Sequence, residues 1–184
     1  MESGRGMALL SELDIVSALE RLGQLAFDQG HTLQLVVVGG AAMVLGYHAR
    51  QATHDIDVVF LPPPEPQIIR LYAKTVADEH GWPEDWLNNA ASGYLIGMSM
   101  GPVILNAPGI EVRQPATEQL LAMKLCAWRD DVDIADATRL LHELSNTGNR
   151  EALWQRMVPY LLPGRELKAE YAFADLWESE YEQN

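Results

Sequence analysis

The sequence predicts an α+β fold, in which helices flank a small mixed β-sheet and a helical C-terminal part follows. Two apolar, β-branched runs at 33–38 and 56–61 are typical of buried strands, and helical spacing surrounds them. Beyond Arg113 only helical patterns remain. At 184 residues, the chain suits an α+β core over residues 1–115 and a helical part over 116–184 packed on that core.

Helical spacing predicts the helices of the first half. Apolar residues recur every three or four positions over Ser11–Gln29, and Gly30 stands where a helix stop is expected. A short helix, Ala41–Tyr47, is predicted to start at Gly39-Gly40. The proline cluster after the second strand predicts the start of a helix over Gln67–His80. Its predicted inner face is Ile68, Ile69, Leu71, Tyr72 and Val76.

The second half begins with a less regular region and then becomes helical. Within Gly81–Asn106, Trp82 and Trp86 predict a loop packed by two indoles, with base stacking as the alternative role. Thr117 is the expected N-cap of the helix that carries Leu120 to Trp128. The other predicted elements are short strands at Tyr94–Ser99, Pro102–Leu105 and Ile110–Arg113, a helix at Val132–Leu144, and helical pattern over Glu151–Tyr181.

The composition of the chain limits the kinds of partner and the cellular location that we expect for it. The net charge of −13 repels polyanions, which disfavours a dedicated nucleic-acid binder and favours a small-molecule substrate or a basic protein partner. The single cysteine, Cys126, excludes an internal disulfide and is expected to be a buried thiol. The N-terminus lacks a signal-peptide layout and no apolar run is long enough for a membrane span. We therefore expect a cytoplasmic protein without membrane association.

The glycine pair Gly39-Gly40 follows the first strand and precedes a helix. Glycines at such a turn let backbone N–H groups approach a phosphate, and a helix N-terminus favours the anion. The alternative is a plain strand-to-helix turn. The Lys-Ser/Thr of a Walker loop and the third glycine of a dinucleotide fingerprint are missing.

Asp55 and Asp57 stand at the start of the second strand, on either side of Ile56. Alternate strand residues share a face, so the two carboxylates are predicted to lie side by side. Two like charges so placed are costly unless a cation shares them, and carboxylates with substrate phosphates suit Mg²⁺. The alternative is a strand-edge pair or an Asx turn.

Two blocks together resemble a known superfamily. Gly39-Gly40 followed by Arg50-Gln51-Ala52-Thr53-His54-Asp55-Ile56-Asp57 resembles motif I of the polymerase-β-type minimal nucleotidyltransferases. Downstream, the helix around Lys124, followed by Asp133-Ile134-Ala135-Asp136, is similar to the Lys plus Asp-x-x-Asp block of AbiEii-like nucleotidyltransferase toxins and their relatives. The resemblance implies a nucleotidyltransferase-type sheet.

The resemblance also implies roles for these residues. Asp55 and Asp57 would be catalytic and would hold Mg²⁺ against the nucleotide phosphates. Gly39 and Gly40 would cradle the triphosphate. In the downstream block, Lys124 would neutralise phosphate charge, and Asp133 or Asp136 would orient Lys124 or the acceptor. Asp133 and Asp136 share a helix face by their spacing, with helix solvation or capping as the alternative, and a surface position is the alternative for Lys124.

Three further positions belong to the predicted site. Arg50 and Thr53 would contact the nucleotide, although Arg50 could equally lock the loop by pairing with Asp55 or Asp57. Glu111, on the predicted strand Ile110–Arg113, is the candidate for the third carboxylate that many relatives place on a later strand. Its alternative is a pair with Arg113 or with solvent.

The implied activity is Mg²⁺-dependent transfer of an NMP from an NTP to a hydroxyl of RNA, such as a tRNA 3′ end, or of a protein. The AbiEii-like block further implies the toxin of a toxin–antitoxin pair. A basic antitoxin or a second copy of the chain would suit the acidic C-terminal segment, Glu166 to Glu182. The alternative is a catalytically inactive nucleotidyltransferase fold that acts as a binding or regulatory module.

Overall fold

The computed structural model describes residues 9–144, 146 and 148–182, with backbone alone at 130–132. Within this range the chain forms two compact units, each described here by itself. The first unit holds the residues up to Ser92 together with Pro102–Gln114. The second holds Gly93–Gly101 together with the residues from Pro115 onward.

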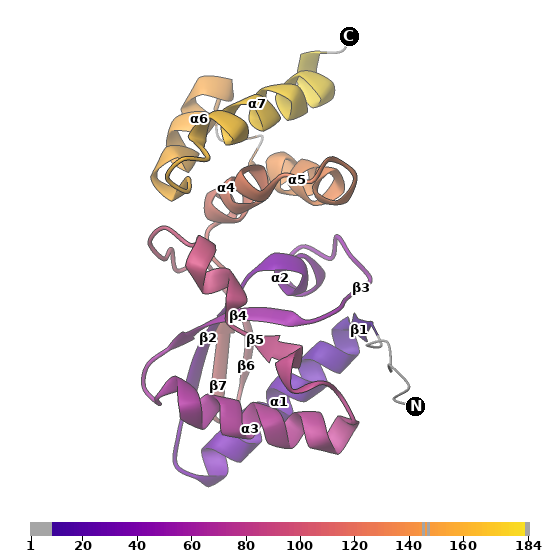
Figure 1. Ribbon diagram of the computed structural model, residues 1–184, viewed down its shortest axis with the longest axis vertical. Helices are drawn as coiled ribbons and strands as arrows, with labels where there is room; N and C mark the ends of the chain where they lie inside the picture. The colour runs from indigo at the N-terminus through magenta and orange to yellow at the C-terminus, as the bar shows by residue number, and fades with distance from the viewer. Residues whose placement is uncertain (1–8, 145, 147, 183–184) are drawn as a thin grey trace. The chain divides into compact units, whose positions relative to one another are not determined.

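The first unit contains three helices and the strands of both sheets (Figure 1). Its helices are α1 (Glu12–Asp28), α2 (Gly39–Leu45) and α3 (Pro66–His80), and the 3₁₀ helix η1 covers Glu84–Trp86. A second 3₁₀ helix, η2, covers Ala90–Tyr94. The strands of the first unit are β1 (Leu10–Ser11), β2 (Leu33–Val37), β3 (Ala52–Thr53), β4 (Ile56–Leu61), β5 (Leu87–Asn88), β6 (Val103–Ala107) and β7 (Ile110–Arg113).

The main sheet has five strands in the order β5-β4-β2-β7-β6, and β1 pairs separately with β3. β2 runs antiparallel to β4 and parallel to β7. At the edges, β5 is parallel to β4 and β6 is antiparallel to β7. The predicted α+β class with a small mixed sheet is confirmed.

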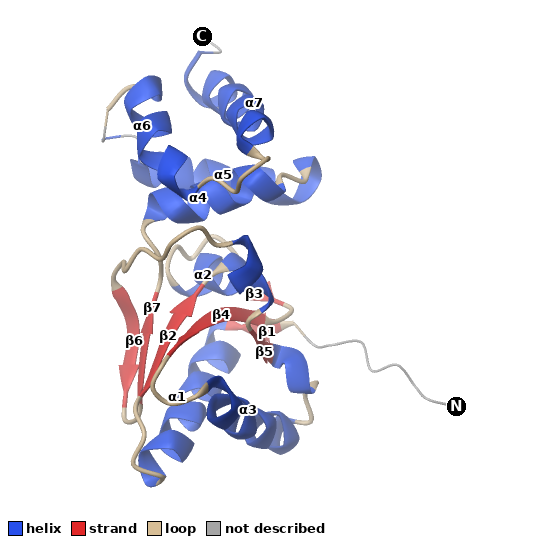
Figure 2. Cartoon of the chain, turned by 60° about the vertical axis from the view of Figure 1, so that its left-hand side comes forward, coloured by secondary structure: helices blue, strands red, loops and turns tan. Residues whose placement is uncertain are grey.

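Helices cover both faces of this sheet. α1 and α3 lie on one face and α2 lies on the other (Figure 2). Along β4, Ile56, Val58 and Phe60 are buried, while Asp57 and Val59 on the opposite side are half-buried. The alternation therefore turns Asp57 away from the face that holds the apolar core.

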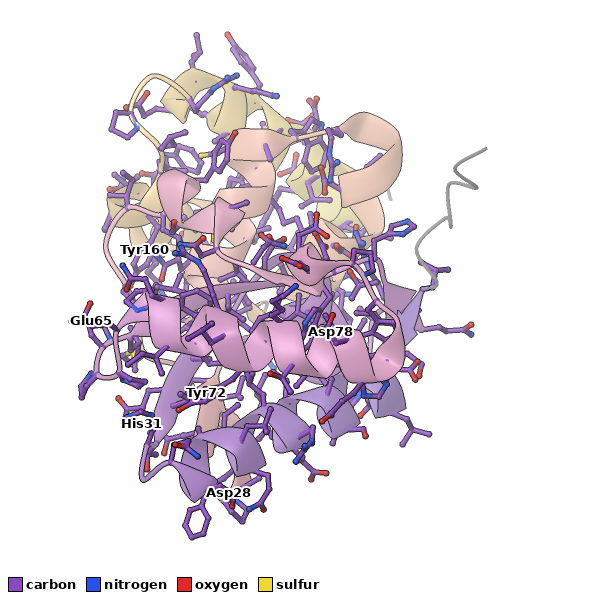
Figure 3. The ribbon with its side chains drawn as sticks, turned by 60° about the horizontal axis from the view of Figure 1, so that its bottom comes forward. Asp28, His31, Glu65, Tyr72, Asp78 and Tyr160 are labelled. Carbon is purple, nitrogen blue, oxygen red and sulfur yellow. The ribbon has the colours of Figure 1, made fainter. Side chains whose placement is uncertain are left out.

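One polar contact joins the start of β2 to α3. His31 Nδ1 lies 2.7 Å from the Tyr72 hydroxyl, between the end of α1 and the side of α3 (Figure 3). α1 itself begins with a capping box, since the Ser11 hydroxyl accepts from Asp14 N while the Asp14 carboxylate accepts from Ser11 N. The first contact ties the turn before β2 to α3, and the second fixes the start of α1.

The second unit is helical. Its helices are α4 (Thr117–Ala127), α5 (Asp130–Leu144), α6 (Arg150–Met157), the 3₁₀ helix η4 (Val158–Tyr160), α7 (Glu166–Trp177) and the π-helix η5 (Glu178–Glu182). Gln119 at the start of α4 is buried and binds the segment Gly93–Gly101. Its Oε1 accepts from Ser99 N and Ser99 Oγ, and its Nε2 donates to the carbonyls of Ile96 and Gly97.

Three local predictions are wrong. Tyr94–Ser99 is not a strand, because Tyr94 ends η2 and the following residues are held as a loop by Gln119. Leu71 is 65% exposed, since Ile69, Ala73 and Val76 form the buried face of α3. Thr117 is the first helical residue and not the N-cap, which is Ala116.

Among the described residues, no helix is both long enough and apolar enough to cross a membrane.

Candidate nucleotide-binding site

The Gly39-Gly40 turn lies where β2 ends and α2 begins. Val38 stays extended and its N–H donates to the Asp57 carbonyl at 2.9 Å, which joins this turn to the start of β4. Gly39 then takes a φ of +61°, a conformation that L side chains adopt at a cost. The sequence uses glycine here because the chain must turn at once from strand into helix.

A side chain on either glycine would also force a neighbouring site residue to shift. A Cβ on Gly39 would lie 2.9 Å from Asp57 Oδ2. A Cβ on Gly40 would lie 2.5 Å from Thr53 Oγ1 and 3.5 Å from Arg50 Nη1. Five predicted residues therefore converge at one turn, on the α2 face of the sheet.

Asp55 precedes β4 and is bound by a residue from the neighbouring strand. Asn88 of β5 donates from Nδ2 to Asp55 Oδ2 at 3.2 Å. The Asn88 amide is oriented by Ala90 N, which donates to its Oδ1 at 2.9 Å. In the part of the chain that the structure describes, this amide contact is the polar interaction of Asp55, and no ion pair neutralises its charge.

The sheet does not bring Glu111 to the aspartates. Glu111 Oε1 accepts from Arg113 Nε at 2.8 Å, and both side chains are partly exposed. Glu111 lies opposite Gln34 on β2, whereas Asp57 lies opposite Val38. Four residues along a strand correspond to about 13 Å. Glu111 is thus on the same sheet face as Asp57 but separated from it along the strand.

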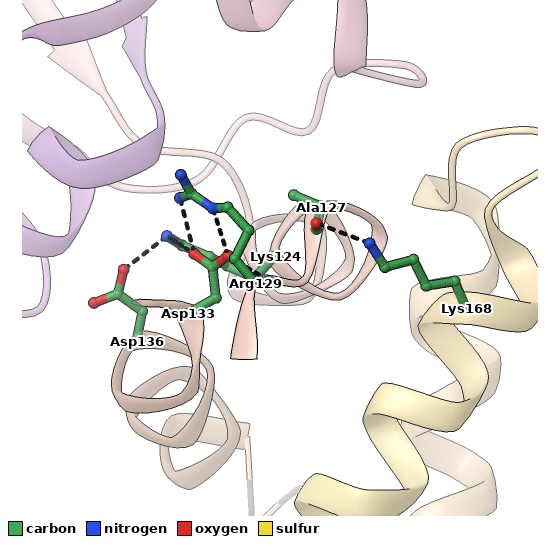
Figure 4. Close-up of polar contacts among 6 residues, drawn as sticks. All are labelled: Lys124, Ala127, Arg129, Asp133, Asp136 and Lys168. Carbon is green, nitrogen blue, oxygen red and sulfur yellow. Dashed lines mark hydrogen bonds and ion pairs between the residues drawn. The ribbon is translucent and has the colours of Figure 1, made fainter. Parts of the chain in front are cut away.

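In the second unit, the structure brings together Lys124, Asp133 and Asp136 (Figure 4). Lys124 Nζ lies 3.1 Å from Asp133 Oδ1 and 2.7 Å from Asp136 Oδ2. Arg129 adds its backbone N–H and its Nε to Asp133 Oδ2. Both carboxylates are buried and the Lys124 side chain is 13% exposed. The predicted shared face of Asp133 and Asp136 is confirmed, and a surface position for Lys124 is wrong. We call Lys124, Arg129, Asp133 and Asp136 the lysine–aspartate cluster.

The cations of this cluster keep Asp133 ionised. Burial by itself raises the pKa of this carboxyl, but the hydrogen bond from Arg129 and the charge of Lys124 together outweigh it. The pKa of Asp133 therefore lies below its ordinary value. The same pairing raises the pKa of Arg129.

Other candidate residues are structural. Trp86 is fully buried and its Nε1 donates to the Ala73 carbonyl, while Trp82 packs between Trp86 and His80. This confirms indole packing over base stacking. Cys126 is buried, and burial raises the pKa of its thiol. Among the described residues, no group of three or more His, Cys, Asp or Glu side chains is arranged to hold a metal.

A comparison with known protein families identifies the family to which this chain belongs. The family described as "Nucleotidyltransferase of unknown function (DUF6036)" matches residues 14–158. The chain belongs to this nucleotidyltransferase family. The matched range spans both the glycine turn with its aspartates and the lysine–aspartate cluster. Comparisons with curated proteins and with solved structures found no match.

The family assignment confirms the predicted nucleotidyltransferase relationship at the level of the superfamily.

One contact residue of the site, Asn88, is not predicted by the sequence. It stands beside Asn89 in a region with loop composition, and its partner Asp55 is 33 residues away along the chain. The pairing depends on the parallel register of β5 with β4, which a two-residue strand does not reveal in the sequence.

Proposed function

We propose that the chain binds an NTP with Mg²⁺ at the glycine turn and transfers the NMP to a hydroxyl acceptor. The observation that carries this proposal is the convergence of Gly39 and Gly40 on Asp57, Thr53 and Arg50. At a turn built from two glycines, no side chain covers the backbone N–H groups, which can therefore approach a phosphate closely. Membership of a nucleotidyltransferase family supports the reaction class.

The donor set suits Mg²⁺, which binds through one or two carboxylates plus substrate phosphates. Asp55 has no ion pair among the described residues, and Asp57 is half-buried beside the turn. These two carboxylates would hold the ion, which when bound neutralises the phosphates of the nucleotide. A third carboxylate is not required for binding, because phosphate oxygens and water complete the ligand set.

The protein residues would act by positioning the nucleotide. Gly39 and Gly40 would admit the phosphates to the backbone, Arg50 would pair with their charge, and Thr53 would support the turn. The acceptor hydroxyl oxygen attacks the α-phosphorus, and the bond from that phosphorus to the α–β bridging oxygen breaks. Pyrophosphate leaves with the electron pair and the hydroxyl proton passes to water. Positioning and charge neutralisation supply most of such catalysis.

The finer resemblance to AbiEii-like toxins is part of the proposal. It is supported by the lysine–aspartate cluster, since Lys124 meets both Asp133 and Asp136. A toxin would need a neutralising partner, for which the acidic α7 with its exposed Leu167 and Tyr171 offers a surface for a basic antitoxin or a second copy. The test is expression in a bacterial host: growth arrest that Asp57→Asn abolishes supports the toxin role, and unaffected growth contradicts it.

A second candidate is a nucleotide-binding module without transfer activity. The observation that favours it is Glu111, which binds Arg113 and lies about 13 Å along the sheet from the position of Asp57. Under this alternative the glycine turn would bind the nucleotide and signal its presence to a partner.

One experiment separates the two. Titration calorimetry with each of the four NTPs and Mg²⁺ measures binding, and α-labelled NTP measures transfer to RNA or protein. We expect binding and transfer by the wild type, with both lost in Asp57→Asn and unchanged in Asp78→Asn, an exposed acid on α3. Binding without transfer would favour the module. Absence of both binding and transfer would contradict both candidates.

A further inference from the structure

A groove of about 460 Å³ lies in the first unit, between α3, β4 and the segment that carries β5. Apolar side chains border it, among them Phe60, Ala73 and Leu87. Its polar lining consists of Gln67, Arg70, Lys74, Glu84, Asp85, Asn88 and Asn89. The lining of the groove includes neither the glycine turn nor the lysine–aspartate cluster.

An open strand edge borders this groove. β5 pairs with Ile56 and Asp57 and then ends, so no described strand pairs with Val58–Leu61 on that side. Because Val38 N donates to the Asp57 carbonyl, Asp57 and Val59 direct their backbone groups toward β2. Phe60 therefore directs its N–H and C=O toward the open edge. Unpaired backbone groups at an edge are a template for another strand.

Side chains with free hydrogen-bonding capacity surround this edge. Gln67, Arg70 and Asn89 make no side-chain hydrogen bond or ion pair with any other residue that the structure describes. Lys74, by contrast, is paired with Glu84. Two amides and one guanidinium over an apolar floor can bind the backbone and an acidic side chain of a peptide.

We propose that this groove takes an extended peptide segment of the acceptor protein, which adds to β4 as a strand. The inference rests on the proposed function and names its acceptor as a protein hydroxyl. A peptide fits the observations better than RNA, because Glu84 and Asp85 line the groove and the chain carries a net charge of −13. Strand addition is an established mode of peptide recognition, in which backbone bonds give affinity and side-chain pockets give specificity.

The groove and the proposed nucleotide site are connected through Asn88. Asn88 lines the groove and donates to Asp55. From Phe60 to Asp57 is three residues, or about 10 Å along the strand. Alternate side chains of an added strand point to the face on which Asp57 lies, so a Ser, Thr or Tyr of the peptide would project there. Its hydroxyl oxygen would form the new bond to the α-phosphorus, with pyrophosphate leaving and the proton passing to water.

The test uses the full chain and two acceptor pools, short random peptides that each hold one Ser, Thr or Tyr, and short random single-stranded RNA. Transfer from α-labelled NTP is measured for the wild type, for Arg70→Glu in the groove and for Leu71→Ala at its exposed border. The controls are Arg165→Glu, which makes the same charge change at an exposed site of the second unit, and Leu13→Ala, which makes the same truncation at an exposed position of α1. Calorimetry with Mg²⁺ and NTP is run on every variant, because it reports the glycine turn alone.

We expect labelled peptides, a loss of about tenfold in Arg70→Glu, a smaller loss in Leu71→Ala, and no change in the controls or in NTP binding. Label on RNA alone, or equal peptide labelling in Arg70→Glu, would overturn the inference. If neither the wild type nor any variant binds NTP, the proposed function fails. Fluorescence anisotropy with the same peptides then tests whether the groove binds a peptide. Binding that Arg70→Glu weakens would support a peptide site, and no binding would overturn it.

Discussion

The chain holds two groups of acidic side chains in opposite electrostatic states. In the lysine–aspartate cluster the carboxylates are buried and two cations, Lys124 and Arg129, bind them. At the glycine turn, Asp55 is half-exposed and its described polar partner is the neutral amide of Asn88. The first group is neutralised by the fold, whereas Asp55 has no ion pair among the described residues and can bind a cation.

This difference assigns two roles: the lysine–aspartate cluster stabilises the fold, and the carboxylate at the glycine turn can bind a cation. A buried ion pair that loses one partner leaves an uncompensated charge, so the lysine–aspartate cluster is expected to control the stability of the second unit. An exposed carboxylate without a cation contributes little to folding and remains able to bind one. The following variants test this contrast, in order of decreasing effect on the free energy of unfolding.

Replacing Lys124 by Met should have the largest effect. The variant keeps the apolar stem but leaves Asp133 with Arg129 alone and removes a cation from Asp136, so we expect a loss of about 3–5 kcal/mol. Lys168→Met is the control, since that exposed lysine donates to the Ala127 carbonyl (Figure 4). Urea denaturation measures both. Equal stability of the two variants would show that the lysine–aspartate cluster does not stabilise the fold.

Asp133→Asn should destabilise by about 2–3 kcal/mol at neutral pH, because hydrogen bonds to charged groups are lost. The pKa of Asp133 is lowered in the folded chain, so its contribution is complete above the ordinary Asp pKa and is lost as the pH falls through the folded-state value. The wild type and the variant should therefore converge in stability as the pH falls below about 4. A constant difference down to strong acid would contradict the charged pairing.

Gly40→Ala should cost about 1–3 kcal/mol, because its Cβ would lie 2.5 Å from the buried Thr53 hydroxyl. We expect Thr53→Ala in the same chain to recover part of this loss. Gly93→Ala is the control, since no atom lies within 4 Å of its Cβ position. Thermal unfolding and NTP titration measure the series. Undiminished NTP binding by Gly40→Ala would argue against a close phosphate approach.

Asp55→Asn should change the free energy of unfolding by no more than about 0.5 kcal/mol, yet abolish Mg²⁺-dependent NTP binding. The amide contact with Asn88 contributes little, and no ion pair among the described residues is broken. Calorimetry with and without Mg²⁺ checks this result against denaturation curves of the same samples. A large loss of stability would place Asp55 with the neutralised group.

Local patterns predicted most of the fold. The strand Ile56–Leu61 has the predicted bounds, and the helix predicted over Gln67–His80 begins one residue earlier. Apolar alternation and proline signals act within a few residues, so a single sequence reveals them. Tyr94–Ser99 was not predictable in this way, because its shape depends on hydrogen bonds from Gln119, which lies about twenty residues further along the chain.

The residues of the candidate site also differ in whether the sequence alone could predict them. The glycine turn and Asp57 could be predicted, since strand, turn and helix follow one another directly in the sequence. The meeting of Lys124 with Asp133 and Asp136 followed from helix spacing and resemblance. The position of Glu111 and the contact of Asn88 could not, because both depend on which strands are neighbours and in which register.

The placement of Gly93–Gly101 has an evolutionary consequence. The chain passes between its two units after Ser92, after Gly101 and after Gln114. A gene fragment that ended near residue 115 would encode Ser99 without Gln119, and the carbonyls of Ile96 and Gly97 would lose their donor. Recombination at this apparent boundary would damage both products, so the sheet and the helices are expected to be inherited together and not exchanged as separate modules.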